Sequence, residues 1–160
     1  MATSESNKAD KSSGLILHYK LEFKQSKENA FAYLREISRR KEFMTIVDET
    51  IITKKTKGRD LTGTRFKERT HFLGFDMNLE YEIAEYAENK IIATKCEDGP
   101  FFPFMKVELL KGDESTCNAE VTVKLKLGAL RLMPKFIIKP TIEVIVKRIL
   151  KKLVARIEAL

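Results

Sequence analysis

The chain ends with the stretch TIEVIVKRILKKLVARIEAL, residues 141–160. Large apolar side chains recur in it at every third or fourth position, the spacing that places side chains on one face of an α-helix. They are Ile142, Ile145, Val146, Ile149, Leu150, Leu153, Val154, Ile157 and Leu160. Pro140, close before them, suits the first turn of a helix. Because so long an apolar face must be buried, the stretch predicts a C-terminal helix packed against a large apolar surface.

The rest of the chain supplies that surface as a series of strands. Apolar and polar residues alternate from Leu15 to Phe23, which predicts a half-buried first strand. Helical spacing then predicts two short helices, at 27–38 and 39–45. Six more strands, joined by short turns, are predicted at 47–57, 64–73, 77–86, 90–97, 104–110 and 116–127. A further short helix is predicted around 130–136. We therefore predict an α+β fold in which a curved antiparallel sheet of about seven strands wraps around the long C-terminal helix.

Length and composition fit one globular domain. The chain has 160 residues, 43% of them hydrophobic and 33% charged, and a chain of this length buries a sizeable core without disulfides or metals. Residues 1–13 contain no large apolar side chain after Met1, so we predict a disordered tail there and a single domain over 14–160. The start of the sequence lacks the apolar segment of a secretory signal. Cys96 and Cys117 form neither a disulfide framework nor a zinc motif, and we expect both to be buried in a protein of the reducing cytoplasm.

Positive charge is concentrated towards the C-terminus. The net charge is +7, and residues 124–160 contain ten basic residues but only two acidic ones. Helical spacing places Lys147, Arg148, Lys151 and Lys152 opposite the apolar face of the final helix. This basic face is either a solvated surface or a peripheral contact with an anionic membrane surface. No nucleic-acid-recognition motif accompanies the charge, so we expect no nucleic-acid partner.

The order of the elements, one strand, two short helices, six strands and a long helix, resembles the helix-grip fold of the START-related superfamily (SRPBCC). This superfamily includes pollen allergens, polyketide cyclases and dehydrases, and lipid-transfer domains. The resemblance covers residues 15–160, and the matching local features are LHYKLEF at 17–23, SKENAFAYL at 26–34, LTGTRF at 61–66 and LVARIE at 153–158. It implies binding of a hydrophobic small molecule or a lipid.

The sequence contains no strong catalytic motif. It has no Gly-x-Ser-x-Gly elbow, no P-loop, no dinucleotide fingerprint and no His-Glu-x-x-His motif. His18 and His71 alone cannot supply a multi-histidine metal site, and we expect no metal and no cofactor. Glu68 is the one unusual residue, because a carboxylate on an apolar face must pair, take up a proton or meet water. It is either a polar anchor or general acid/base inside a cavity, or a residue near a strand end that reaches solvent.

The alternation of side chains along the strand at 64–73 predicts which of them face the interior. Arg65, Lys67 and Arg69 form a basic face that cannot be the inner one, so the residues between them point inward. The cavity lining that we expect is Phe66, Glu68, Thr70, Tyr81, Met105, Val123 and Ile145, with Glu68 as the main polar contact. Tyr81 either offers its hydroxyl to a ligand or is a satisfied core tyrosine.

Three functions are consistent with these observations. The leading hypothesis is binding or carriage of an apolar small molecule or lipid in an internal cavity, without catalysis. The first alternative is a cyclase- or dehydratase-type enzyme that uses Glu68 and Tyr81 as acid and base. The second is a protein-interaction domain with no ligand. The apolar cluster FFPFM at 101–105 either gates the cavity, contacts a membrane or packs at the edge of the sheet.

Overall fold

The computed structural model describes residues 3–4, 14–130 and 133–160. Its elements are β1 (Thr3–Ser4), β2 (Gly14–Phe23), α1 (Lys27–Leu34), the 3₁₀ turn η1 (Ile37–Arg39), α2 (Arg40–Phe43), β3 (Val47–Lys54), β4 (Arg65–Phe72), β5 (Phe75–Ala87), β6 (Ile91–Cys96), β7 (Phe104–Gly112), β8 (Cys117–Lys126), the 3₁₀ turn η2 (Gly128–Leu130) and α3 (Lys135–Glu158). The prediction of a disordered tail at 1–13 lies outside the described residues, apart from Thr3 and Ser4, which pair with β2.

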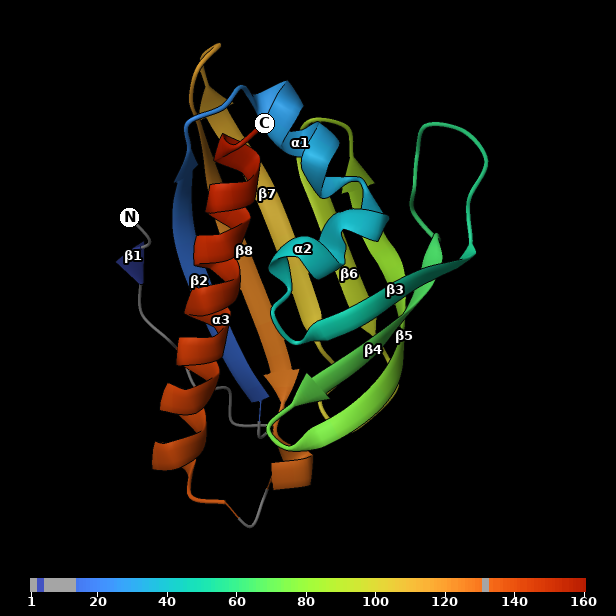
Figure 1. The fold of residues 1–160 in the computed structure, drawn as a ribbon, viewed down its shortest axis with the longest axis vertical. Helices are drawn as coiled ribbons and strands as arrows, with labels where there is room; N and C mark the ends of the chain where they lie inside the picture. Colours follow the sequence, from blue (N-terminus) through green and yellow to red (C-terminus); the bar gives the residue numbers. More distant parts are fainter. Residues whose placement is uncertain (1–2, 5–13, 131–132) are drawn as a thin grey trace.

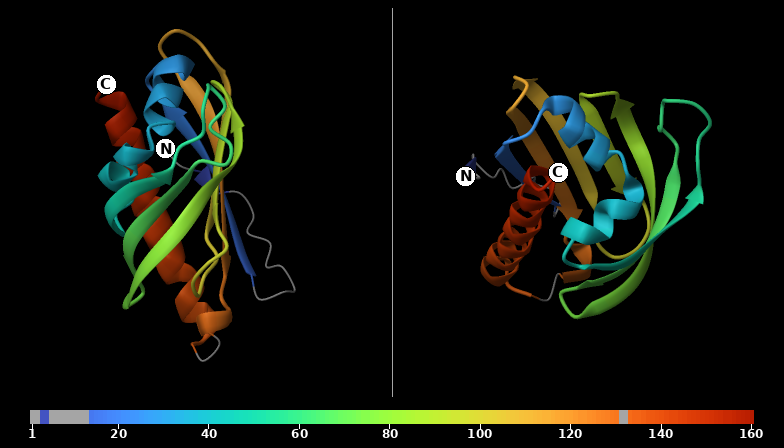
Figure 2. Two further views of the ribbon diagram at one scale, coloured as in Figure 1. Left: turned by 90° about the vertical axis from the view of Figure 1, so that its right-hand side faces the viewer. Right: turned by 45° about the horizontal axis from the view of Figure 1, so that its top comes forward.

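In the described part of the chain, one antiparallel sheet contains eight strands in the order β1-β2-β8-β7-β6-β5-β4-β3. Strands β3 to β8 form a meander, whereas β2 pairs with β8 over its whole length, from Gly14↔Lys126 to Phe23↔Cys117. Figures 1 and 2 show the sheet curving around α3. The predicted α+β fold, a curved antiparallel sheet around a long C-terminal helix, is confirmed, and the two-residue β1 is the strand beyond the predicted seven.

Alternation along β4 decides which side chains reach the interior. Its basic residues are exposed, while Phe66, Glu68, Thr70 and Phe72 are buried. Phe66 lies opposite Tyr81 of β5, and the two rings stack with their centroids 5.3 Å apart. The inner face of the sheet is therefore apolar except for a few polar groups, and Glu68 is one of them.

Helix α3 packs its apolar face against the concave side of the sheet. Its buried apolar side chains keep helical spacing and are Ile138, Ile142, Val146, Ile149, Leu150, Leu153 and Ile157. The helix begins at Lys135, so Pro140 lies inside it rather than in its first turn. Proline cannot donate a hydrogen bond to the carbonyl four residues earlier, and the hydroxyl of Thr141 donates to the next carbonyl, that of Ile137, at 2.8 Å. In the described residues, no separate helix occupies 130–136, because η2 ends at Leu130 and α3 begins at Lys135.

Two short helices cover one end of the concave face (Figure 1). Ser26 caps α1, since its Oγ accepts a hydrogen bond from the N–H of Asn29 at 3.2 Å. The helix predicted over 27–38 ends at Leu34, and the chain continues through the 3₁₀ turn η1 directly into α2. This four-residue helix packs against α3 and β3 and brings Arg40 into the interior.

Two further observations concern the cysteines and the helices. Cys96 and Cys117 are both buried and free of disulfide bonds. Within residues 3–4, 14–130 and 133–160, no helix is both long enough and apolar enough to cross a membrane.

Candidate ligand-binding cavity

A cavity of about 80 Å³ lies between the concave face of the sheet and α3. Strands β4 to β8, helix α2 and helix α3 all contribute side chains to its wall. Most of these side chains are aliphatic, aromatic or methionine, and only Arg40, Thr70, Tyr81 and Thr94 are polar. The cavity therefore suits a largely apolar molecule that carries a small number of polar atoms.

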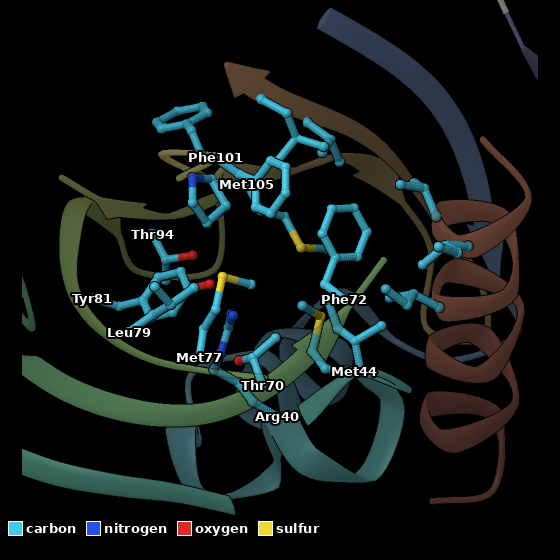
Figure 3. Close-up of a pocket in the computed structure, with 18 of the residues that line it drawn as sticks. Arg40, Met44, Thr70, Phe72, Met77, Leu79, Tyr81, Thr94, Phe101 and Met105 are labelled. Carbon is cyan, nitrogen blue, oxygen red and sulfur yellow. The ribbon is translucent and has the colours of Figure 1, made fainter. Parts of the chain in front are cut away.

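Methionine gives the cavity an adaptable wall. Three of the five methionines of the chain, Met44, Met77 and Met105, line it, and Figure 3 shows their side chains around its centre. Methionine is unbranched and polarizable, so it repacks around different shapes at low cost. An adjoining cavity of about 20 Å³ shares Met105, Arg40 and Thr94 with the first. A rotation of Met105 would therefore enlarge the available space.

The loop between β6 and β7 forms another part of the wall. Phe101 is 2% exposed and meets Phe72 edge to face, with ring centroids 5.1 Å apart. Gly99 has a φ of 75°, and a Cβ at this position would come within 2.5 Å of the Cδ2 atom of Leu79, which lines the cavity. Phe102 has a φ of 44° and is exposed. Within the FFPFM cluster, the first phenylalanine thus packs inward and the second faces solvent.

The polar side chains are gathered along one side of the cavity. Figure 3 shows Thr94, Tyr81, Arg40 and Thr70 following one another along that side. All four are at most 6% exposed. Among the described residues, the Oγ1 atom of Thr70 has no hydrogen-bond partner. A buried hydroxyl without a partner is energetically unfavourable, so a ligand that provides one gains affinity.

Arg40 is held in place by Glu68, whose exposure is 0%. The Nε atom of Arg40 donates to Oε1 of Glu68 at 2.6 Å, and Nη2 donates to Oε2 at 3.4 Å. The guanidinium carbon also lies over the rings of Phe66 and Tyr81, 5.1 and 5.5 Å from their centroids. These contacts fix the guanidinium group on the polar side of the cavity, with Glu68 as its counter-ion.

Burial and the ion pair set the protonation states on this side. Burial alone lowers the pKa of Arg40, but the charge of Glu68 and the hydrogen bonds to it outweigh that effect and raise the pKa above its ordinary value. Burial, followed by the charge of Glu68, raises the pKa of Tyr81 far above its ordinary value. Arg40 is therefore charged and Tyr81 is a neutral phenol at neutral pH.

Known structures share this architecture at low sequence identity. A START superfamily protein from Mycobacterium smegmatis superposes with a TM-score of 0.74 and 14% identity, over 90% of this chain and 97% of that one. The Zhui aromatase/cyclase from Streptomyces superposes with a TM-score of 0.73 and 9% sequence identity, over 91% of this chain and 94% of that one. For Ara h 8.0201 the TM-score is 0.63 and the identity 11%, over 92% of this chain and 99% of that one. This chain has the START-like helix-grip fold. No protein-family model and no curated protein matches the sequence.

The resemblance to the START-related superfamily inferred from the sequence is thus confirmed for the fold. Within this helix-grip cavity, the structure brings together five of the seven predicted lining residues. They are Thr70, Tyr81, Met105, Val123 and Ile145. The alternation of side chains along the strands predicted Thr70, Tyr81 and Val123, and the helical spacing of α3 predicted Ile145. Their contact with a ligand stays a prediction.

The other two predicted residues do not line the helix-grip cavity. Phe66 and Glu68 are both fully buried, and Arg40, which does line the cavity, contacts each of them. The interpretation of Glu68 as a solvated residue near a strand end is wrong, since it lies in the middle of β4 and pairs with Arg40.

Arg40 is the charged cavity-lining residue that the strand pattern did not reveal. Two signals in the sequence point to it. Glu68 on an inward face requires a cationic partner. Arg40 also precedes Phe43 and Met44 by three and four positions, which places all three on one side of a helical turn.

Metal binding has no support in the described residues. No group of three or more histidine, cysteine, aspartate or glutamate side chains among them is arranged to hold a metal ion. His18 lies on the outer surface with its Nδ1 atom 3.2 Å from Oγ1 of Thr122. His71 is also exposed, with its Nδ1 atom 3.3 Å from Oδ2 of Asp48. Both histidines therefore take part in surface contacts away from the cavity.

Proposed function

We propose that the protein binds an apolar small molecule or lipid in the cavity between the sheet and α3, and carries it without changing it. The observation that carries the proposal is the unpaired hydroxyl of Thr70 in an otherwise apolar wall. Folded proteins pair almost all of their buried polar groups. An unpaired hydroxyl that borders a cavity is explained when a ligand provides the missing partner.

The size of the cavity limits what it holds without rearrangement. Its volume of about 80 Å³ is below the roughly 150 Å³ of an engineered apolar cavity that accepts benzene. A ligand of one ring or a short chain therefore needs a modest displacement of Met44, Met77 or Met105. A longer lipid requires the adjoining space beyond Met105 as well.

Carriage is favoured over catalysis by the position of Glu68. An acid or base must come within hydrogen-bond reach of the reacting group. Glu68 does not line the cavity, and both of its oxygens accept hydrogen bonds from Arg40. The raised pKa of Tyr81 also makes its hydroxyl a weak acid at neutral pH. The pair therefore suits a structural role better than the acid and base of a cyclase or dehydratase.

A titration with isopropylbenzene tests the proposal. In protein labelled with ¹³C in the methionine methyl groups, the resonances of Met44, Met77 and Met105 should shift. The resonance of Met133, which is 44% exposed and does not line the cavity, should not.

Two tryptophan variants provide matched controls, because the chain contains no tryptophan. Val123→Trp should fill the cavity, abolish the shifts and show the blue-shifted emission of a buried indole. Val144→Trp, on an exposed position of α3, should bind as wild type. Equal binding by both variants would place the ligand elsewhere.

We also propose an anionic membrane surface as a peripheral partner. Lys147, Arg148, Lys151 and Lys152, here called the basic α3 cluster, are all exposed. The same outer face of α3 carries Val144, which is 55% exposed, and Phe136, at the start of the helix, is 79% exposed. Exposed apolar groups beside a cationic cluster suit the boundary between acyl chains and anionic headgroups. The two free cysteines support a reducing, cytoplasmic location.

A further inference from the structure

The polar side of the cavity indicates the chemical class of the ligand. We infer that it selects a neutral hydrogen-bond acceptor, such as the carbonyl of a ketone, ester or amide, over a carboxylate or another anion. This inference rests on the proposed function, because it names the group that the proposed ligand presents to Arg40, Thr70, Tyr81 and Thr94.

Charge balance is the first argument. Arg40 is the one charged side chain among the described residues that line the cavity, and Glu68 already neutralises it through the 2.6 Å contact between Nε and Oε1. Both side chains are buried. An anion that entered would lose its hydration and would meet a neutral pair rather than a free positive charge. A carbonyl loses far less hydration on entry.

The supply of hydrogen-bond donors is the second argument. A guanidinium group has five N–H donors and no acceptor, and Glu68 receives two of them in the described structure. Tyr81, Thr94 and Thr70 are hydroxyl-bearing residues of the cavity wall, and the hydroxyl of Thr70 has no hydrogen-bond partner among the described residues. The carboxylate of Glu68, the strongest acceptor nearby, is turned to Arg40. Each hydroxyl can donate or accept, whereas the guanidinium group can only donate. The donors that remain on Arg40 are therefore completed by an acceptor, and the hydroxyls can adapt to it.

The remaining wall requires the rest of the ligand to be apolar. Phe72, Phe101, Leu125 and Ile145 border the same space and offer no hydrogen bonds. The ligand class that follows is a compact hydrocarbon skeleton with a single carbonyl. The hydrocarbon would lie against α3 and the phenylalanines, and the oxygen would lie against Arg40 and the hydroxyls.

Three ligands with the same number of non-hydrogen atoms separate the possibilities. They are acetophenone, which has a carbonyl, benzoate, which has a carboxylate, and isopropylbenzene, which has neither. Titrations at neutral pH follow the ¹³C-methyl resonances of Met44, Met77 and Met105, with Met133 as the internal control. Acetophenone should bind about tenfold more tightly than isopropylbenzene, on the scale of one or two net hydrogen bonds. Benzoate should bind more weakly than either.

Two threonine variants test whether the preference for acetophenone comes from the polar side of the cavity. Thr70→Val keeps the shape of the side chain and removes the unpaired hydroxyl, so the protein should stay folded. Its affinity for acetophenone should fall about threefold to tenfold, and its affinity for isopropylbenzene should not change. Thr50→Val is the matched control. The hydroxyl of Thr50 lies 3.4 Å from Oε1 of Glu68 but does not line the cavity, so both affinities should stay at the wild-type level.

Removing the counter-ion should reverse the preference. In Glu68→Gln the charge of Arg40 is no longer neutralised, so benzoate should gain affinity relative to acetophenone. An unchanged ratio in the folded variant would overturn the argument from charge balance. If the variant does not fold, the three wild-type titrations and Thr70→Val decide the question.

The outcomes distinguish this inference from the function on which it rests. Equal binding of acetophenone and isopropylbenzene, or benzoate binding as tightly as acetophenone, overturns the selection of a neutral acceptor and leaves an apolar cavity that binds ligands. If none of the three ligands shifts the resonances of the cavity methionines, the proposed function fails, and the inference fails with it.

Discussion

Replacing either member of the buried pair Arg40–Glu68 alone should destabilise the protein strongly, whereas replacing both should not. The two side chains are 6% and 0% exposed and meet at 2.6 Å. Loss of one partner leaves an uncompensated buried charge, which costs about 3–5 kcal/mol. We therefore expect this loss for Arg40→Met and for Glu68→Leu. Methionine would keep a favourable contact with the rings of Phe66 and Tyr81.

The double variant Arg40→Met/Glu68→Leu replaces the pair with apolar side chains. Buried ion pairs exchanged for apolar residues of similar volume are often neutral or more stable, so we expect the double variant within about 1 kcal/mol of wild type. Urea unfolding followed by far-UV circular dichroism measures the difference. With a slope of about 2 kcal/mol per molar urea, each single variant should lower the midpoint by roughly 1.5–2.5 M.

A surface pair provides the control for this cycle. Arg65 and Glu82 meet at 3.3 Å with side chains that are 51% and 33% exposed, so Arg65→Met should cost less than about 1 kcal/mol. Single variants of the buried pair that behave like this control would refute the reasoning. A double variant as unstable as the sum of the two single variants would refute it as well.

Leu150→Asp should unfold the protein, because Leu150 lies on the buried face of α3 and is 0% exposed. The neighbouring variant Lys151→Asp, on the exposed face, should have a melting temperature within a few degrees of wild type. A well-folded Leu150→Asp protein would contradict the packing of α3 on the sheet. The free energy of unfolding should fall as pH rises from about 10 to about 12. Burial and the charge of Glu143 raise the pKa of Tyr19 to about 12 in the folded state, whereas Tyr19 in the unfolded chain ionises near its ordinary pKa of 10.0. In Tyr19→Phe the urea midpoint should decline less steeply over this pH range. Changing the basic α3 cluster to glutamate should abolish co-sedimentation with vesicles that contain phosphatidylserine, and unchanged sedimentation would exclude the membrane contact.

The sheet was predictable from the sequence because alternation is a local property. Polar and apolar residues alternate along β4, and the buried and exposed side chains follow the same order. The start of α3 was less predictable. Pro140 reads as a first-turn proline, and the residues before it break the amphipathic pattern, since Phe136 and Ile137 are exposed. The helix in fact begins at Lys135, and this start depends on the direction of the chain after η2. The local spacing of apolar residues does not determine that direction.

The cavity lining was predictable from the sequence only where it follows from the alternation of side chains along a strand. Parity identifies Thr70 and Tyr81 as inward, and the structure places both on the cavity wall. It identifies Glu68 in the same way, yet Arg40 stands between that carboxylate and the cavity. Which of two paired side chains faces the open space depends on the length of each side chain and on the position of a helix only four residues long. Neither is encoded by a period of two or of 3.6 residues.

The pairing of β2 with β8 has a consequence for how the chain folds during synthesis. Phe23 lies opposite Cys117, so the first long strand leaves the ribosome long before its partner exists. At about 5–20 residues per second, the interval is roughly 5–20 s. During this time Leu17 and Leu21, buried in the finished sheet, remain exposed to solvent or to chaperones. Because α3 follows all of the strands in the sequence, the concave face is also uncovered until α3 has been made. Closing such a distant strand pair is slow, and the newly made chain therefore passes through a stage that is prone to aggregation.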